Sequence, residues 1–240
     1  MDPSSARAPA APTEGRSLPV ALLYAMVFVE GFASLGAEII ALRRLVPHLG
    51  SAITVTAPTI GFFLLALALG YQAGGRVAGA YLERVRINFL WAAALIVLGL
   101  AGPVVDALFA HVRPAWLAWL LLVGGVLGPI AWLLGQTVPV LTNLLRFERT
   151  GERSGAALYW STLGSFLGSL SLSLGIMQWL GVAAAVMICG GLLVAVALCL
   201  PVAPGGRWRA AAITLALAAG GAGANLMLPQ QIETAYATYR

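Results

Sequence analysis

Two acidic residues, Glu30 and Glu38, stand inside a long apolar stretch near the N-terminus, at 18–42. A carboxyl group in such a stretch is costly unless it binds a cation, carries a proton or hydrogen-bonds to a neighbouring helix. Eight residues of helix separate two groups by roughly 12 Å along the axis and about 80° around it. The pair is therefore not a close carboxylate dyad. For Glu30, a polar cavity or cation site and a protonated carboxyl bonded to another helix both remain open.

Polar side chains in other apolar stretches are the possible partners of these acids. For Glu30 they are Gln72, Gln136, Thr137, Tyr159, Ser161 and Thr162. For Glu38, Arg43 and Arg44 lie one to two turns further along and could neutralise it in an ion pair at the membrane edge. The candidate intramembrane polar site consists of Glu30, Glu38, Arg43, Gln136 and Tyr159.

Residues that could support catalysis or metal binding are few. Cys189 and Cys199 are ten positions apart in one apolar stretch, about three helical turns, so they cannot bridge each other within a straight helix. His48 and His111 are too few to hold a metal without other ligands. No nucleophile stands in a convincing pairing with a base, which disfavours an intramembrane hydrolase. We expect no catalytic, metal or cofactor site.

The elements that position these residues are apolar helices. Hydrophobic residues make up 60% of the 240 residues, charged residues 10%, and the mean hydropathy is +0.90, which excludes an ordinary soluble domain. Seven stretches approach the roughly 20 residues that a membrane span needs. They are 18–42, 52–73, 87–109, 116–141, 156–179, 182–200 and 210–228. The sequence predicts an all-α polytopic integral membrane bundle of about seven transmembrane helices, with an interfacial helix as the alternative for the seventh.

Three regions follow from this pattern. Residues 1–17, rich in Ala, Pro and Ser, are expected to form a disordered cytoplasmic tail rather than a cleaved signal. Residues 18–228 form the transmembrane domain, and residues 229–240 form a C-terminal stub.

Arginine placement predicts the orientation. All fourteen basic residues are Arg, and an N-terminus in the cytoplasm puts ten of them on the inner side and four on the outer side. The positive-inside rule then favours a cytoplasmic N-terminus and, with seven spans, a periplasmic C-terminus. Arg-only usage with much Ala and Gly suggests a bacterial protein of the inner membrane. The pI of about 9.8 needs no nucleic acid, because arginines facing anionic lipid explain it.

Glycine pairs and prolines indicate where helices pack and bend. The pairs Gly70 and Gly74, Gly124 and Gly128, and Gly164 and Gly168 each place two small residues on one helix face. Such faces permit close packing within the chain, or alternatively a homodimer seam. Prolines 58, 129 and 139 predict kinks or an internal polar pocket, and Gly181 predicts a tight turn between the fifth and sixth spans.

Four short segments of the chain form a pattern by their order and spacing. Residues 31–51 carry Glu38, Arg43, Gly50 and Ser51; residues 63–76 end in Gly-Arg; residues 129–141 carry Leu134-Gly135 and Pro139; and residues 159–168 read Y-W-S-T-L-G-S-F-L-G. Together they resemble the membrane domain fused to bacterial spermidine synthase-like proteins, a family of polyamine aminopropyltransferases. The resemblance covers the first six spans and, more loosely, the seventh. The Gly79-Ala80 pair, which follows the Gly-Arg, departs from the pattern of that family.

The C-terminal stub resembles the first strand of an aminopropyltransferase domain, although Ala235 replaces the usual Pro. We expect the chain to lack the family's catalytic domain, with its nucleoside-binding loop and acidic proton acceptor, and therefore not to be an enzyme. Two functions remain. One is a non-catalytic module or complex subunit that anchors another membrane protein or a separate soluble domain. The other is a carrier of a small solute, such as a polyamine or another cation, that uses Glu30 and Glu38.

Overall fold

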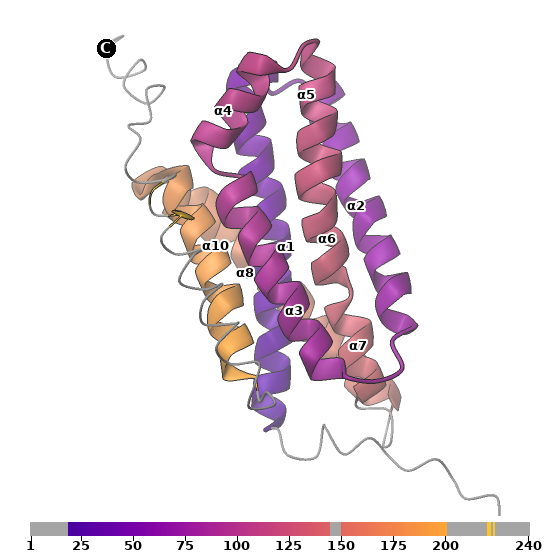
Figure 1. Ribbon diagram of the computed structural model, residues 1–240. Coiled ribbons are helices and arrows are strands. Elements are labelled where there is room, and N and C mark those ends of the chain that lie inside the picture. The colour runs from indigo at the N-terminus through magenta and orange to yellow at the C-terminus, as the bar shows by residue number, and fades with distance from the viewer. Residues whose placement is uncertain (1–18, 145–149, 201–219, 222, 224–240) are drawn as a thin grey trace, which may run out of the picture.

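A computed structural model describes residues 19–144, 150–200, 220–221 and 223, and these residues form an all-α bundle without a strand (Figure 1). Four helices are long and apolar enough to cross a membrane, or five if one bent helix pair counts as a span. The structure therefore confirms the all-α bundle that the sequence predicts. The predicted regions 1–17 and 229–240 lie outside the described residues, as does nearly all of the seventh stretch.

The helix α1 (Val20–Leu49) runs through the interior of the bundle and is buried along most of its length. It ends at Gly50, whose φ of 77° suits glycine better than any other residue. The predicted end at residue 42 was wrong, because the helix continues through Arg43 and Arg44 to the last turn. Leu45 is buried and keeps this turn packed on the bundle, so the two arginines are helical rather than part of a loop.

The helix α2 (Ile53–Gly75) returns antiparallel to α1, and α3 (Tyr81–Ala94) with the π-helical η2 (Leu95–Gly99) leads back. A bend of 63° then separates this segment from α4 (Gly102–His111). The third stretch is therefore not the single helix predicted at 87–109. The bend lies where Pro103, at the start of α4, cannot donate a hydrogen bond to the carbonyl of Gly99.

The fourth stretch is a chain of short helices that lies alongside α2. Its parts are α5 (Ala115–Leu122), η3 (Val123–Leu127), α6 (Gly128–Gly135) and α7 (Thr137–Leu144). The π segment ends two residues before Pro129, one of the predicted interruptions, and a turn at Gln136 separates α6 from α7. Pro58, in contrast, lies within the continuous α2.

The helix α8 (Thr150–Ser171) continues through η4 (Leu172–Ile176) into α9 (Met177–Trp179). It runs parallel to α1, because Gly164 and Gly168 meet Phe28 and Phe32 in that order. The α8–α9 segment is not among the helices that are apolar enough to count as spans by composition alone. Gly181, with φ of 82°, makes the predicted turn into α10 (Gly181–Cys199).

Candidate intramembrane polar site

Glu30 lies in the interior of the bundle and is hydrogen-bonded to α8. Glu30 is 2% exposed, and the hydroxyl of Ser161 donates a hydrogen bond to its Oε2 over 2.8 Å. Among the partners considered from the sequence, Ser161 is the one that forms this bond. The residue is therefore one end of a polar bridge between two parallel helices.

The close approach of α1 and α8 makes this bridge possible. A Cβ atom on Gly31 would collide with the carbonyl of Ser161, and one on Gly164 would collide with the carbonyl of Phe28. The hydroxyl of Ser165 donates to the carbonyl of Gly31 over 3.1 Å. Two serines and two glycines thus form a seam of small residues in which the helix backbones touch, as membrane helices without a hydrophobic driving force require.

Glu38 is buried at 6% exposure and accepts no hydrogen bond from the residues that the structure describes. The ion pair predicted between Glu38 and Arg43 does not form, because five residues of helix turn the two side chains about 140° apart. Arg43 is exposed. Arg44 is half-buried and donates its Nε to the carbonyl of Leu100 over 3.3 Å, which ties α1 to the bend before α4.

Gln136 belongs to a second polar group, between α3 and α6. It is fully buried, accepts a hydrogen bond from Nε of Arg84 over 3.3 Å and donates to the carbonyl of Trp132 over 3.2 Å. One turn along α3 from Arg84, Asn88 donates to the carbonyl of Leu133 over 3.2 Å. The sequence analysis missed Arg84 and Asn88, whose spacing of four residues places both on one face of a helix.

Tyr159 is not part of the polar site. It is 61% exposed, and its ring packs edge-on against Trp160 with centroids 5.6 Å apart. Two residues of helix turn it about 200° away from Ser161, so it faces outward when Ser161 faces α1. An exposed aromatic residue of this kind is typical of the lipid-facing surface of a membrane helix.

The three glycine pairs differ in their surroundings. Gly70 and Gly74 lie against the backbone of Trp132 and Gln136, so this pair brings α2 onto α6. Gly164 and Gly168 lie against the backbone of α1. The third pair makes no comparable approach to another helix: a Cβ atom on Gly124 would find only Leu120, at 4.0 Å, and one on Gly128 would lie 3.3 Å from the carbonyl of Val123 in its own segment and 3.9 Å from Ala66.

The C-terminal end of α1 carries a histidine that contacts an acidic residue of α4. Nε2 of His48 lies 3.1 Å from Oδ1 of Asp106 in α4, and the imidazole stacks on the ring of Phe109 with centroids 4.4 Å apart. Nδ1 of His111 contacts the carbonyl of Ala107, one turn back in α4. Among the described residues, no three His, Cys, Asp or Glu side chains gather closely enough to hold a metal ion.

Comparisons of the chain with protein-family models, curated proteins and solved structures find no match. The chemistry of the site must therefore be inferred from its geometry. The interhelical hydrogen bonds described above join α1 to α8, α1 to α4 and α3 to α6, and Nε1 of Trp119 adds a link from α5 to Thr59 of α2 over 2.9 Å. The arrangement is one that fixes helices against each other.

Proposed function

We propose that this chain is a non-catalytic integral membrane module that anchors or scaffolds a partner protein, as the membrane domain of spermidine synthase-like proteins would. The observation that carries the proposal is the bridge from Glu30 to Ser161. The carboxyl group most costly to bury is bonded at the seam where α1 and α8 meet backbone to backbone. A group held in this way stabilises a scaffold without requiring a solute.

The second polar group supports the same role. Arg84, Gln136 and Asn88 link α3 to α6, and Asn143 of α7 donates to the carbonyls of Gly75 and Val77 at the end of α2, over 3.2 and 3.5 Å. These contacts hold both ends of the α2–α3 connection. A rigid connection at one end of the bundle is suited to presenting a surface to a partner, which we expect to be another membrane protein or a separate soluble domain.

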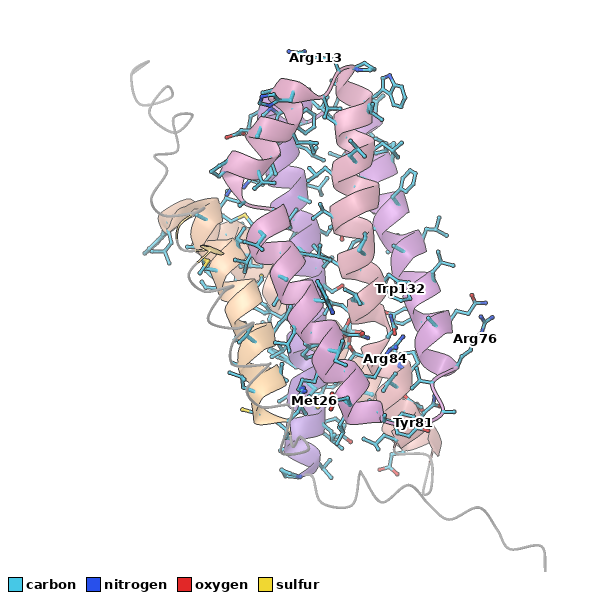
Figure 2. The ribbon with its side chains drawn as sticks, viewed as in Figure 1. Met26, Arg76, Tyr81, Arg84, Arg113 and Trp132 are labelled. Atoms are coloured by element: carbon cyan, nitrogen blue, oxygen red, sulfur yellow. The ribbon has the colours of Figure 1, made fainter. Side chains whose placement is uncertain are left out.

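We further propose the bacterial inner membrane as the location, with the N-terminus in the cytoplasm. The start of α1, Arg76 and Arg84 lie at one end of the bundle, and Arg113 lies at the other, where Arg43 and Arg44 also stand in the last turns of α1 (Figures 1 and 2). With ten of the fourteen arginines of the sequence on the inner side, the positive-inside rule supports a cytoplasmic side at the end where α1 starts. Alkaline phosphatase fused after residue 240 should be active, whereas a fusion within 147–154 should be inactive. The opposite pattern would contradict this orientation.

The scaffold role is tested by crosslinking the tagged chain in its native membrane and identifying the crosslinked peptides by mass spectrometry. An unrelated polytopic protein with the same tag and expression level is the control. One partner crosslinked to the same residues in replicate membranes, and absent from the control, is the expected result. Crosslinks scattered over many proteins at the level of the control would contradict the proposal.

A cation carrier is the second candidate, and the burial of Glu38 without a hydrogen bond from a described residue favours it. A carrier would accumulate labelled spermidine in proteoliposomes, and Glu38→Gln should abolish the uptake while the fold stays intact. Glu152→Gln, at an exposed position near the start of α8, is the matched control. The absence of flux from the unmodified chain, for spermidine and for monovalent cations, would contradict the carrier and favour the scaffold.

A further inference from the structure

A hollow of about 510 Å³ lies where α2 ends and α3 begins. Among its lining residues are Arg76, Val77, Ala80, Glu83, Arg84 and Ile87. Two of them are arginines on different elements, and Figure 2 shows both at the same end of the bundle. The hollow is separate from the bridge between Glu30 and Ser161.

The wall of this hollow is held in place by hydrogen bonds. Asn143 donates to the carbonyl of Val77, which lines the hollow, and to that of Gly75 just before it. Arg84 uses its Nε to bond Gln136, so its guanidinium group is oriented while its two terminal nitrogens make no hydrogen bond to a described residue. These bonds hold the backbone at Val77 and the guanidinium group of Arg84 in place on the wall of the hollow.

The charge of the hollow is positive. Arg76 is exposed and forms no ion pair with the residues that the structure describes. Glu83, the acidic residue among the lining side chains, accepts a hydrogen bond from Nη2 of Arg86 over 3.3 Å. Arg86 is itself buried at 5% exposure, and its Nε and Nη1 have no partner among the described residues. The lining thus carries two arginines, Arg76 and Arg84, and one carboxylate that Arg86 already bonds, so its excess of positive charge attracts an anion.

The chain around the hollow also fits an anion that carries an apolar tail. The helix α3 begins beside it at Tyr81, and its first amide groups receive no side-chain cap. Such amides favour negative charge. From the hollow, Ile87 and Trp91 continue along α3 at a spacing of four residues, and both are exposed. They form an apolar strip on which an acyl chain could lie.

We propose that the Arg76–Arg84 hollow binds the phosphate group of an anionic lipid, with the acyl chain along Ile87 and Trp91. Guanidinium groups recognise phosphate oxygens by charge and by paired hydrogen bonds. Basic hollows at the ends of membrane helices bind anionic headgroups in this manner. A free phosphate ion shares the headgroup chemistry but makes no use of the apolar strip, and the experiment below separates the two sources.

The test is a titration of the purified full chain in detergent with dioleoyl phosphatidylglycerol, followed by native mass spectrometry. Phosphatidylcholine, which has the phosphate but no net charge, is titrated in parallel. Arg76→Gln should weaken phosphatidylglycerol binding about fivefold, and Arg76→Gln with Arg84→Gln about thirtyfold. Arg113→Gln, at the opposite end of the bundle, is the matched control and should leave binding unchanged (Figure 2).

Two further variants keep the test decisive. Arg84→Lys retains the charge but loses the bond to Gln136, so it should bind more tightly than Arg84→Gln. Trp91→Ala removes part of the apolar strip, so it should weaken the binding of the lipid but not that of a phosphate ion. If phosphate competes with the lipid equally well in Trp91→Ala and in the unmodified chain, free phosphate is the ligand and the lipid assignment is overturned. Unchanged lipid binding in Arg76→Gln, or equal losses in Arg76→Gln and Arg113→Gln, would overturn the site itself. Arg76→Gln suffices if Arg84 variants do not fold, because Arg76 is exposed.

Discussion

Gly164→Ala should destabilise the protein more than any other single methyl group added to α8. The new Cβ atom would collide with the carbonyl oxygen of Phe28 and would lie 3.1 Å from its Cα atom. Both atoms belong to the backbone of α1, so no side chain can rotate away from the collision. The two helix axes must move apart, and the bond from Ser161 to Glu30 must lengthen with them.

The size of the effect follows from three terms. Overpacking costs about 1–3 kcal/mol. A weakened hydrogen bond between membrane helices adds roughly 0.6 kcal/mol. Alanine in place of glycine in a helix returns up to about 1 kcal/mol. The free energy of unfolding should therefore fall by about 2 kcal/mol, which is roughly thirtyfold in the folding equilibrium.

The measurement is the unfolding of the purified chain in mixed micelles with increasing dodecyl sulfate, followed by circular dichroism. Gly191→Ala is the matched control, because Gly191 is an exposed glycine of α10 and a Cβ atom there meets nothing within 4 Å. We expect this control to leave stability unchanged or slightly raised. Equal midpoints for the two variants would refute the close approach of α1 and α8 and, with it, the geometry of the Glu30 bridge.

Three other outcomes are expected, two from the same contacts and one from the proposed function. Ser161→Ala should lower the free energy of unfolding by about 1–3 kcal/mol, because it leaves a buried carboxyl group without its donor. The hydroxyl of Ser169 bonds within its own helix, so Ser169→Ala should have less effect in the same titration. Glu30→Gln keeps an acceptor for Ser161, so it should unfold near the midpoint of the unmodified chain; a loss as large as that of Ser161→Ala would show that the acid itself is required. The purified chain should transfer no aminopropyl group from decarboxylated S-adenosylmethionine, and turnover above that of empty-vector membranes would contradict a non-catalytic module.

The apolar helices were predictable because their signal is local. A run of about 20 apolar residues must form a helix in lipid, where each backbone amide has to find a partner within its own segment. Gly181 could likewise be recognised as a turn from one residue. The ends of the helices were less predictable: α1 continues beyond Arg43 because Leu45 packs on the bundle, and the third stretch bends before α4 because of Pro103.

The candidate site was predictable in part. A buried acid in an apolar stretch indicates a polar partner, so Glu30 could be selected from sequence, but at least six residues were equally eligible to bond it. The choice of Ser161 depends on Gly31 and Gly164, which bring two helices that are 131 residues apart in sequence into backbone contact. Tyr159 was chosen wrongly because composition does not say which face of α8 meets α1.

The sequence by itself therefore determined which segments form apolar helices and which of their residues are too polar to face lipid. The tertiary structure decided which of those residues meet, because meeting depends on helix rotation and on the parallel pairing of α1 with α8. Neither the rotation of a helix nor its pairing partner can be recognised from a single position of the sequence. The hollow between Arg76 and Arg84 has the same origin, since it exists only where Asn143 and Gln136 hold the end of α2 and the start of α3 in place.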